Sequence, residues 1–258
     1  QGIKARDMLH QFMEKAIQEK LQRNNPEDDS DALDFIINSA KEHGKELTVQ
    51  ELKESAIELI FAAFFTTASA STSLILLLLK HPSVIEKMRQ ELMSHNLYQE
   101  WQSCHCPLDI SLEKLSRLRY LDCVIKEVLR VLPPVSGGYR TALQTFELDG
   151  YQIPKGWSVM YSIRDTHETA AVYQSPPSAF DPDRFSATRI EVAGRFHYIP
   201  FGGGARSCIG KELAQAILKL LAIELVSTAR WELATPGYPA MQTVPIVHPV
   251  DDGLHLYF

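Results

Sequence analysis

The spacing of apolar residues predicts a chain built mainly of helices. Between residues 5 and 22, apolar side chains recur at helical intervals on an otherwise polar segment, at Met8, Leu9, Phe12, Ile17 and Leu21. The same reasoning predicts further helices over residues 34–40, 51–80, 84–93, 115–132 and 211–228. Thr48 and Glu51 form a capping box at the start of the long helix, and His81-Pro82 ends it.

The second half of the chain has a different pattern. Residues 144–159 alternate around turns at Asp149-Gly150 and at 154–156, which predicts a small β-hairpin region. Residues 175–185 form a meander rich in Pro and Asp, residues 201–210 a glycine-rich loop, and residues 231–258 short strands and turns. The predicted fold class is therefore mainly α with minor β.

The uncharged stretch 59–79 has two interpretations. It is long enough to cross a bilayer, which takes about 20 apolar residues. Its middle contains hydroxyl side chains at Thr66, Thr67, Ser69, Ser71, Thr72 and Ser73. This polarity suits a helix buried in protein better than one that faces lipid, so the buried helix is favoured and the membrane span is the alternative.

Composition narrows the class of protein. The 258 residues carry a net charge of −6, with 22% charged and 45% hydrophobic residues, which is typical of a globular chain and argues against nucleic acid as a partner. Four irregularly spaced cysteines indicate a reducing compartment rather than a disulfide framework. Cys104-His105-Cys106 lacks the second Cys/His pair that a zinc site needs, and we interpret His167 and His197 as structural.

The strongest chemical signal is the loop that precedes the helix over 211–228. Cys208 stands just before that helix, so its thiolate would face the positive helix end. Glycines at 202, 203, 204 and 210 allow the backbone to approach a flat ligand, and Arg206 can pair with a carboxylate. A thiolate is the ligand that an iron centre needs to help break an O–O bond.

Two simpler interpretations of this loop compete with iron binding. A glycine-rich loop before a helix can hold a phosphate, but neither GxxxxGK[ST] nor GxGxxG is present. A lone cysteine near a helix start is commonly a small core residue. The set spacing of Phe, Gly, Arg, Cys and Gly favours the iron ligand.

The loop matches the pattern FxxGxRxCxG of the cytochrome P-450 family at every defined position. This resemblance implies that Phe201, Gly204, Arg206, Cys208 and Gly210 bind haem b, with Cys208 as the metal ligand. It also implies that residues 1–258 are the C-terminal, haem-binding part of a single domain, without the N-terminal half and the membrane anchor. That part of the P-450 fold comprises the long central helix, the ExxR helix, the meander, the Cys-ligand loop and the helix after it.

Other segments resemble the family in the same order. Glu127 and Arg130 resemble its ExxR pair and lie on one helix face, and residues 180–185 resemble the meander whose Arg184 completes a structural ion network. By itself an ExxR pair is common on helix surfaces, where it contributes under about 1 kcal/mol. Arg140 resembles the arginine that reaches a haem propionate.

Residues 62–67 align with the family pattern [AG]Gx[DE]TT of the long central helix. The resemblance implies that Thr66 and Thr67 are catalytic, because their hydroxyls help to deliver protons during oxygen activation. Ala63 replaces the usual Gly and Phe65 the usual acid, so ordered water and the hydroxyls would have to carry the proton. The alternative role for these hydroxyls is bonding back to helix carbonyls.

Several stretches resemble the retinoic-acid-hydroxylating branch of the family, at residues 66–73, 133–140, 146–157 and 247–251, and the ending is most similar to its third vertebrate type. The resemblance implies hydroxylation of retinoic acid at ring C4 with O₂. It also implies electrons from NADPH through a flavoprotein reductase, and residence on the cytoplasmic face of the endoplasmic reticulum membrane. The expected wall of an apolar retinoid pocket is Phe61, Phe64, Phe65, Val135 and Met241.

Two other functions stay open. One is a haem-thiolate isomerase that rearranges peroxides without a reductase, against which Thr66 argues. The other is a truncated haem-binding chain without catalytic activity, which the short length and the start at Gln1 favour. We expect the 258 residues by themselves to bind haem poorly and to turn over little substrate.

Overall fold

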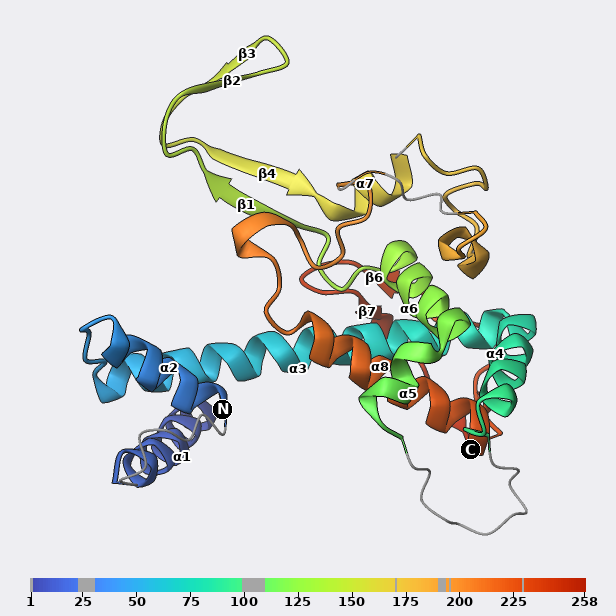
Figure 1. Cartoon of the computed structure of the whole chain (residues 1–258), viewed down its shortest axis with the longest axis horizontal. Helices are drawn as coiled ribbons and strands as arrows, with labels where there is room; N and C mark the ends of the chain where they lie inside the picture. The colour runs from blue at the N-terminus through green and yellow to red at the C-terminus, as the bar shows by residue number, and fades with distance from the viewer. Residues whose placement is uncertain are drawn as a thin grey trace. The chain divides into compact units, whose positions relative to one another are not determined.

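The computed structural model describes residues 2–22, 31–98, 110–169, 171–189, 194, 196–228 and 230–258. The chain divides into two compact units, residues 1–64 and residues 65–258, which are described separately. The helices and 3₁₀ turns (η) are α1 Gly2–Gln22, α2 Ala32–Glu42, α3 Val49–Lys80, α4 Pro82–Ser94, α5 Leu112–Arg117, α6 Arg119–Val131, α7 Ile163–Thr169, η1 Pro182–Phe185, η2 Gly204–Arg206, α8 Lys211–Thr228 and η3 Val250–Asp252 (Figure 1). The strands are β1 Gly137–Thr141, β2 Phe146–Leu148, β3 Tyr151–Ile153, β4 Ser158–Ser162, β5 Glu232–Leu233, β6 Met241–Gln242, β7 His248–Pro249 and β8 Leu256–Tyr257.

The first unit contains α1, α2 and the start of α3. Ile17 of α1 and Leu52 of α3 are buried, and Lys53 Nζ lies 2.9 Å from Glu14 Oε2. The predicted capping box is confirmed: the Thr48 amide donates to Glu51 Oε2 over 2.9 Å, and the Glu51 amide donates to Thr48 Oγ1 over 3.2 Å. These two bonds satisfy backbone donors that a helix start leaves without partners.

Helix α3 changes character along its length. Leu74 and Leu78 are fully buried, whereas Phe61 and Phe64 are 60% and 66% exposed. By length and composition α3 qualifies as a membrane span, although only 39% of its apolar window is buried. The buried-helix interpretation therefore holds for the end of α3 and is wrong for residues 60–65.

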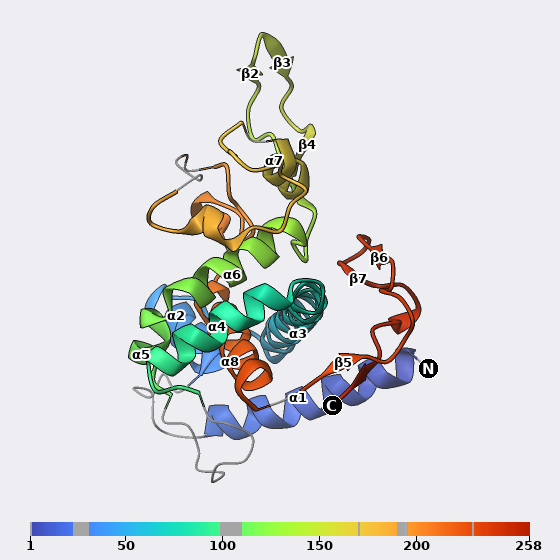
Figure 2. The same ribbon diagram turned by 90° about the vertical axis from the view of Figure 1, so that its right-hand side faces the viewer.

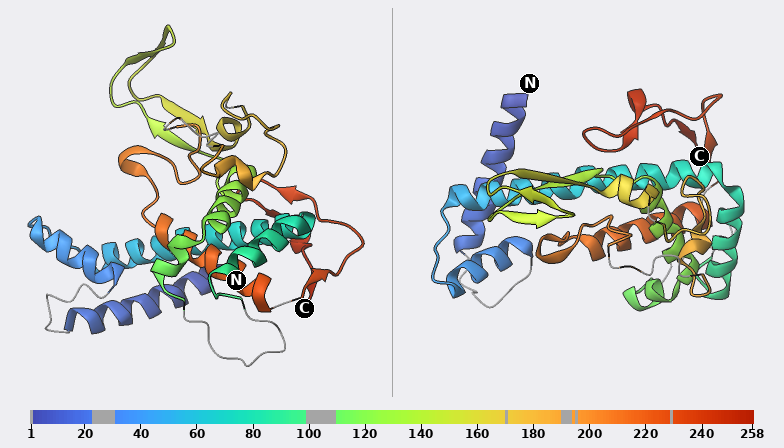
Figure 3. Two further views of the ribbon diagram at one scale, coloured as in Figure 1. Left: turned by 45° about the vertical axis from the view of Figure 1, so that its right-hand side comes forward. Right: turned by 90° about the horizontal axis from the view of Figure 1, so that it is seen from above.

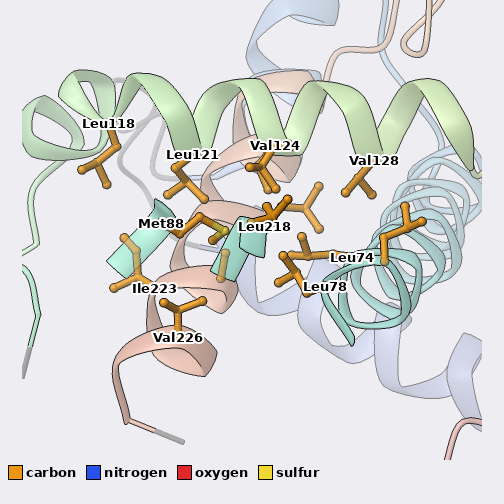
Figure 4. Close-up of a cluster of buried hydrophobic side chains, with 14 of the residues drawn as sticks. Leu74, Leu78, Met88, Leu118, Leu121, Val124, Val128, Leu218, Ile223 and Val226 are labelled. Carbon is orange, nitrogen blue, oxygen red and sulfur yellow. The ribbon is translucent and has the colours of Figure 1, made fainter. Parts of the chain in front are cut away.

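The core of the second unit lies where α3, α4, α6 and α8 pack together. Figure 4 shows side chains from these four helices meeting in one cluster, and Figure 2 looks along α3 with the other three helices beside it. The labelled members are Leu74, Leu78, Met88, Leu118, Leu121, Val124, Val128, Leu218, Ile223 and Val226. This cluster fixes α6 and α8, the two helices that carry or follow the candidate site residues.

The predicted helix over 115–132 is wrong as a single element, because it breaks at Leu118 into α5 and α6. Leu118 is fully buried and has a non-helical ψ of 87°. Glu91 of α4 caps the new helix start: its carboxylate accepts from the amides of Tyr120 over 2.7 Å and Leu121 over 2.9 Å. The break therefore depends on a side chain from another helix, which the local pattern of residues cannot reveal.

Within the part of the chain that the structure describes, the strands form four separate two-stranded antiparallel sheets, in keeping with the predicted minor β content. β1 pairs with β4, and the β2–β3 hairpin continues from them around the predicted turn at Asp149-Gly150, as Figure 1 shows. Figure 3 shows β5 to β8 gathered near the C-terminus, apart from this ribbon. The helix α7, directly after β4, was not predicted. The sequence feature that could have predicted its start is Ser162, whose Oγ accepts from the Asp165 amide over 3.0 Å as a helix cap does.

Candidate functional site: the Cys208 loop and its ion network

The structure brings Glu127, Arg130 and Arg184 together in the interior, with each side chain at most 1% exposed. Arg130 donates to both carboxylate oxygens of Glu127, from Nε over 2.7 Å and from Nη2 over 2.9 Å. Arg184 Nε and the Asp181 amide donate to Glu127 Oε1 over 3.4 Å and 2.9 Å. This is a buried network rather than the common surface pair, because three charges have left water together.

The two guanidinium groups also bind backbone carbonyls. Arg130 donates to the carbonyls of His167 and Ala179 over 3.3 Å and 3.1 Å. Arg184 donates over 3.2 Å to each of the carbonyls of Ser175, Pro176 and Ala179, the last of which it shares with Arg130. The network therefore helps to hold the meander against α6, because Arg130 stands on α6 and donates to the meander carbonyl of Ala179.

The loop that carries Cys208 is shaped by its own backbone. Gly202 and Gly204 have φ of 71° and 72°, a region that side-chain-bearing residues rarely adopt. The Cys208 amide donates to the Phe201 carbonyl over 2.9 Å, and the Gly202 amide donates to the Ile199 carbonyl over 2.9 Å. α8 begins three residues after Cys208, and the Cys208 thiol is exposed and outside any disulfide.

A glycine lies beside the Cys208 sulfur. A Cβ at Gly210 would meet only Cys208 Sγ, at 3.9 Å, and one at Gly204 would meet nothing within 4 Å. Within the described residues no group of three His, Cys, Asp or Glu side chains could hold a bare metal ion. A porphyrin supplies the equatorial ligands of its iron, so one exposed thiol is what haem needs from this loop, and these residues fit haem.

Arg140 is placed near the loop by a residue that sequence reasoning missed. Its Nη2 donates to Tyr161 Oη over 3.4 Å, and its guanidinium lies 5.2 Å from the Tyr161 ring centre. A Cβ at Gly202 would lie 3.7 Å from that hydroxyl, whereas one at Gly138 would clash with it at 2.7 Å. Tyr161 of β4 thus connects Arg140 of β1 with the Cys208 loop, while Arg206 is exposed at the end of η2.

Thr66 and Thr67 are half-buried in α3, between its exposed and its buried parts. Their neighbours show the alternative roles of hydroxyls on this helix. Thr72 donates back to the Ala68 carbonyl over 3.0 Å, and Ser69 donates to the Val247 carbonyl of the C-terminal segment. Hydroxyls from this helix therefore already bind carbonyls in two places.

Of the five residues expected to line a substrate pocket, Met241 lines a cavity in the second unit. A cavity of about 110 Å³ is lined by Met241 together with Val131, Leu132, Pro133, Ser136, Arg164, Thr243 and Val247. Val135 and Phe65 are 39% and 47% exposed, and Phe61 and Phe64 belong to the first unit. This cavity is below the range of about 300–1,000 Å³ that small-molecule pockets occupy. Cys104-His105-Cys106 lies outside the described residues.

His167 is fully buried beside the ion network. Its Nδ1 lies 3.2 Å from the Arg130 carbonyl and its Nε2 lies 3.0 Å from the Ile199 amide. Burial, which disfavours the charged form, lowers the pKa of His167 to about 4. The expected structural role of His167 thus has specific partners, whereas sequence reasoning gave it none.

Sequence comparison identifies the family. A cytochrome P450 family model matches residues 1–249. Cytochrome P450 26C1 of Homo sapiens is 66% identical over 274 residues, covering 100% of this chain and 52% of the relative. Cytochrome P450 26B1 of Mus musculus is 62% identical over 258 residues, covering 100% of this chain and 50% of the relative. The chain therefore spans about half the length of these relatives.

Solved structures share the fold. The retinoic-acid-bound cyanobacterial CYP120A1 is 35% identical with a TM-score of 0.82, and the match covers 98% of this chain and 55% of that one. The cytochrome P450 CYP102L1 has the same TM-score of 0.82 at 24% identity, covering 97% of this chain and 55% of that one. The second likeness shows the fold alone.

Replacing Glu127 with Gln should lower the free energy of unfolding by roughly 3–5 kcal/mol, because two buried guanidinium groups lose their counter-charge. Urea unfolding followed by circular dichroism measures this. The matched control is Glu113→Gln, which removes an exposed carboxylate paired with Arg117 and should leave stability nearly unchanged. Equal effects of the two variants would contradict a dominant role for the buried network.

Stability should depend on pH through His167. The unfolded chain takes up a proton at this side chain as the pH falls through about 6.5, whereas the folded chain does so only near 4. The free energy of unfolding should therefore fall by roughly 3 kcal/mol between pH 6.5 and pH 4 from this group and be fully regained above 6.5. His167→Gln should show a flatter curve in that window, while the exposed-site control His43→Gln follows the wild type; identical slopes in all three proteins would refute the assignment.

Proposed function

The chain belongs to the cytochrome P450 family, and we propose that it is the haem-binding part of a haem-thiolate monooxygenase that hydroxylates retinoic acid. The observation that carries the proposal is the exposed Cys208 thiol on its glycine-shaped loop. In this proposal residues 1–258 are part of a single P450 domain.

The residues around Cys208 divide the binding of haem between them. Cys208 Sγ would ligate the iron, and the guanidinium groups of Arg140 and Arg206 would pair with the propionates. Phe201 packs against the hydrophobic core and anchors the loop, Gly204 shapes the loop with its φ of 72°, and Gly210 places no side chain beside the sulfur. When bound, haem supplies the redox chemistry that activates dioxygen, and a thiolate ligand favours O–O cleavage by donating electron density.

The α3 hydroxyls and external partners complete the proposed reaction. Phe65 stands where the family pattern has an acid, so this part of the helix offers no carboxylate as a proton carrier. Thr66 Oγ1, with Thr67 beside it, would therefore pass protons toward the site. Electrons come from NADPH through a flavoprotein reductase, and the whole protein resides at the endoplasmic reticulum membrane.

Retinoic acid is the proposed substrate for two reasons. CYP120A1, which shares 35% identity with this chain, was solved with retinoic acid bound. Residues 66–73, 133–140, 146–157 and 247–251 also resemble the retinoic-acid-hydroxylating branch. The proposed pocket wall remains Phe61, Phe64, Phe65, Val135 and Met241, of which all except Met241 are at least 39% exposed in this structure.

Cys208→Ala should abolish the long-wavelength Soret band that carbon monoxide gives with reduced thiolate-ligated haem. The matched control is Cys123→Ala, which removes a buried thiol of α6 and should keep the band. The spectra are recorded for the 258-residue chain alone and joined to the N-terminal half of human cytochrome P450 26C1, and we expect a much weaker band from the chain alone. A Cys208→Ala protein that keeps the band, or no band in either form of the wild type, would refute the proposal.

Thr66→Ala should lower retinoic acid hydroxylation per NADPH consumed by roughly tenfold or more in the joined holoprotein, because a proton relay is lost. The control on the same helix is Thr72→Ala, whose hydroxyl bonds back to the Ala68 carbonyl and should leave this ratio unchanged. Turnover is measured by chromatography with reductase and NADPH present. Conversion of a peroxide substrate without reductase, and no oxidation of retinoic acid with it, would indicate the isomerase instead.

A further inference from the structure

His167 connects the buried ion network with the segment that precedes the Cys208 loop. It stands in α7, and it exchanges bonds with Arg130 in both directions: Arg130 Nη1 donates to the His167 carbonyl over 3.3 Å, and His167 Nδ1 lies 3.2 Å from the Arg130 carbonyl. On its other side the ring meets the Ile199 amide, at 3.0 Å from Nε2. The imidazole therefore bridges the ion network and the chain that leads into the Cys208 loop.

The partners of His167 fix its protonation state. A backbone amide can only donate, so Nε2 must accept and carries no proton. A backbone carbonyl can only accept, so Nδ1 carries the proton and donates to Arg130. A second proton on the ring would point at the Ile199 amide hydrogen. The geometry thus selects one neutral tautomer.

The bridge continues to the sulfur through the backbone. The Ile199 carbonyl accepts from the Gly202 amide over 2.9 Å, and the Phe201 carbonyl accepts from the Cys208 amide over 2.9 Å. Tyr198, beside Ile199, stacks on the His167 ring at 5.3 Å and donates from its hydroxyl to the Lys126 carbonyl of α6 over 3.0 Å. Residues 198–199 are therefore linked to α6 at Lys126, through the Tyr198 hydroxyl, and at Arg130, through His167. These two positions lie one helical turn apart.

We propose that His167, as the neutral Nδ1–H tautomer, is a positioning residue that transmits the order of the Glu127–Arg130–Arg184 network to the Cys208 loop and so sets where the thiol lies. The functional meaning rests on the proposal that Cys208 ligates iron. The ordering of the Cys208 loop is measured without haem, whereas ligation by Cys208 is tested by the carbon monoxide spectrum. Each proposal can therefore be refuted without the other.

Side-chain length offers a matched set of variants. A Gln side chain is long enough to place an amide oxygen where Nε2 accepts from Ile199, whereas Asn reaches only the position of Nδ1. Phe fills the same space without either bond. His167→Gln should therefore retain the contact to the loop, His167→Asn the contact to α6, and His167→Phe neither.

The experiment measures amide hydrogen exchange at Ile199, Gly202 and Cys208 relative to Val124 in the α6 core. His167→Phe and His167→Asn should speed loop exchange relative to the core by roughly tenfold, the effect of losing one well-placed hydrogen bond, and His167→Gln should restore most of the protection. The control Thr169→Ala removes an exposed hydroxyl from the same helix, which donates to the Asp165 carbonyl, and should leave the ratio of loop to core exchange unchanged.

Nitrogen NMR of the wild-type imidazole supplies a second readout that a purely space-filling role would not give. We expect a protonated Nδ1 and an unprotonated Nε2 at neutral pH. The opposite tautomer, or a loop-to-core ratio that is the same in the Phe, Asn and Gln variants, would overturn the proposal. If His167→Phe does not fold, the Gln and Asn pair and the tautomer still decide it.

Discussion

The Glu127 carboxylate is the point on which the second unit depends. It lies out of water with two guanidinium groups, and the cost of desolvating three charges is offset only because each finds several partners. Glu127 balances one positive charge, and the carbonyl dipoles of the meander and of His167 accept further guanidinium hydrogens. Residues 175–181 of the meander, which belong to no helix or strand, thereby obtain a fixed path across α6.

That fixed path matters for the chemistry because no single regular element holds the Cys208 loop. Its position follows from contacts on two sides: the His167 bridge and the Tyr198 hydroxyl tie its approach to α6, and Tyr161 connects it with β1. α8 then continues into the core through Leu218 and Ala222. A thiol at the end of these connections is exposed without being loosely held, which is what ligation of a large flat group requires.

Local patterns in the sequence account for much of this arrangement. The Thr48 capping box, the bounds of α8 and the turn at Asp149-Gly150 all follow from neighbouring residues, and so does the pairing of Glu127 with Arg130 at one helical turn. Contacts between distant segments could not be predicted. The break at Leu118, the placing of Arg140 by Tyr161 and the partners of His167 each depend on a residue from another element.

The cap that Glu91 provides for α6 has a consequence for how the molecule assembles. A helix of 13 residues is marginal in water, and this one begins at a non-helical Leu118 whose side chain makes no cap. The donors at its start are satisfied from α4, 29 and 30 residues earlier in the chain. The helix that bears Glu127 and Arg130 is therefore completed only when α4 docks, so its formation is cooperative with the tertiary structure, and the ion network has no preformed scaffold in the unfolded chain.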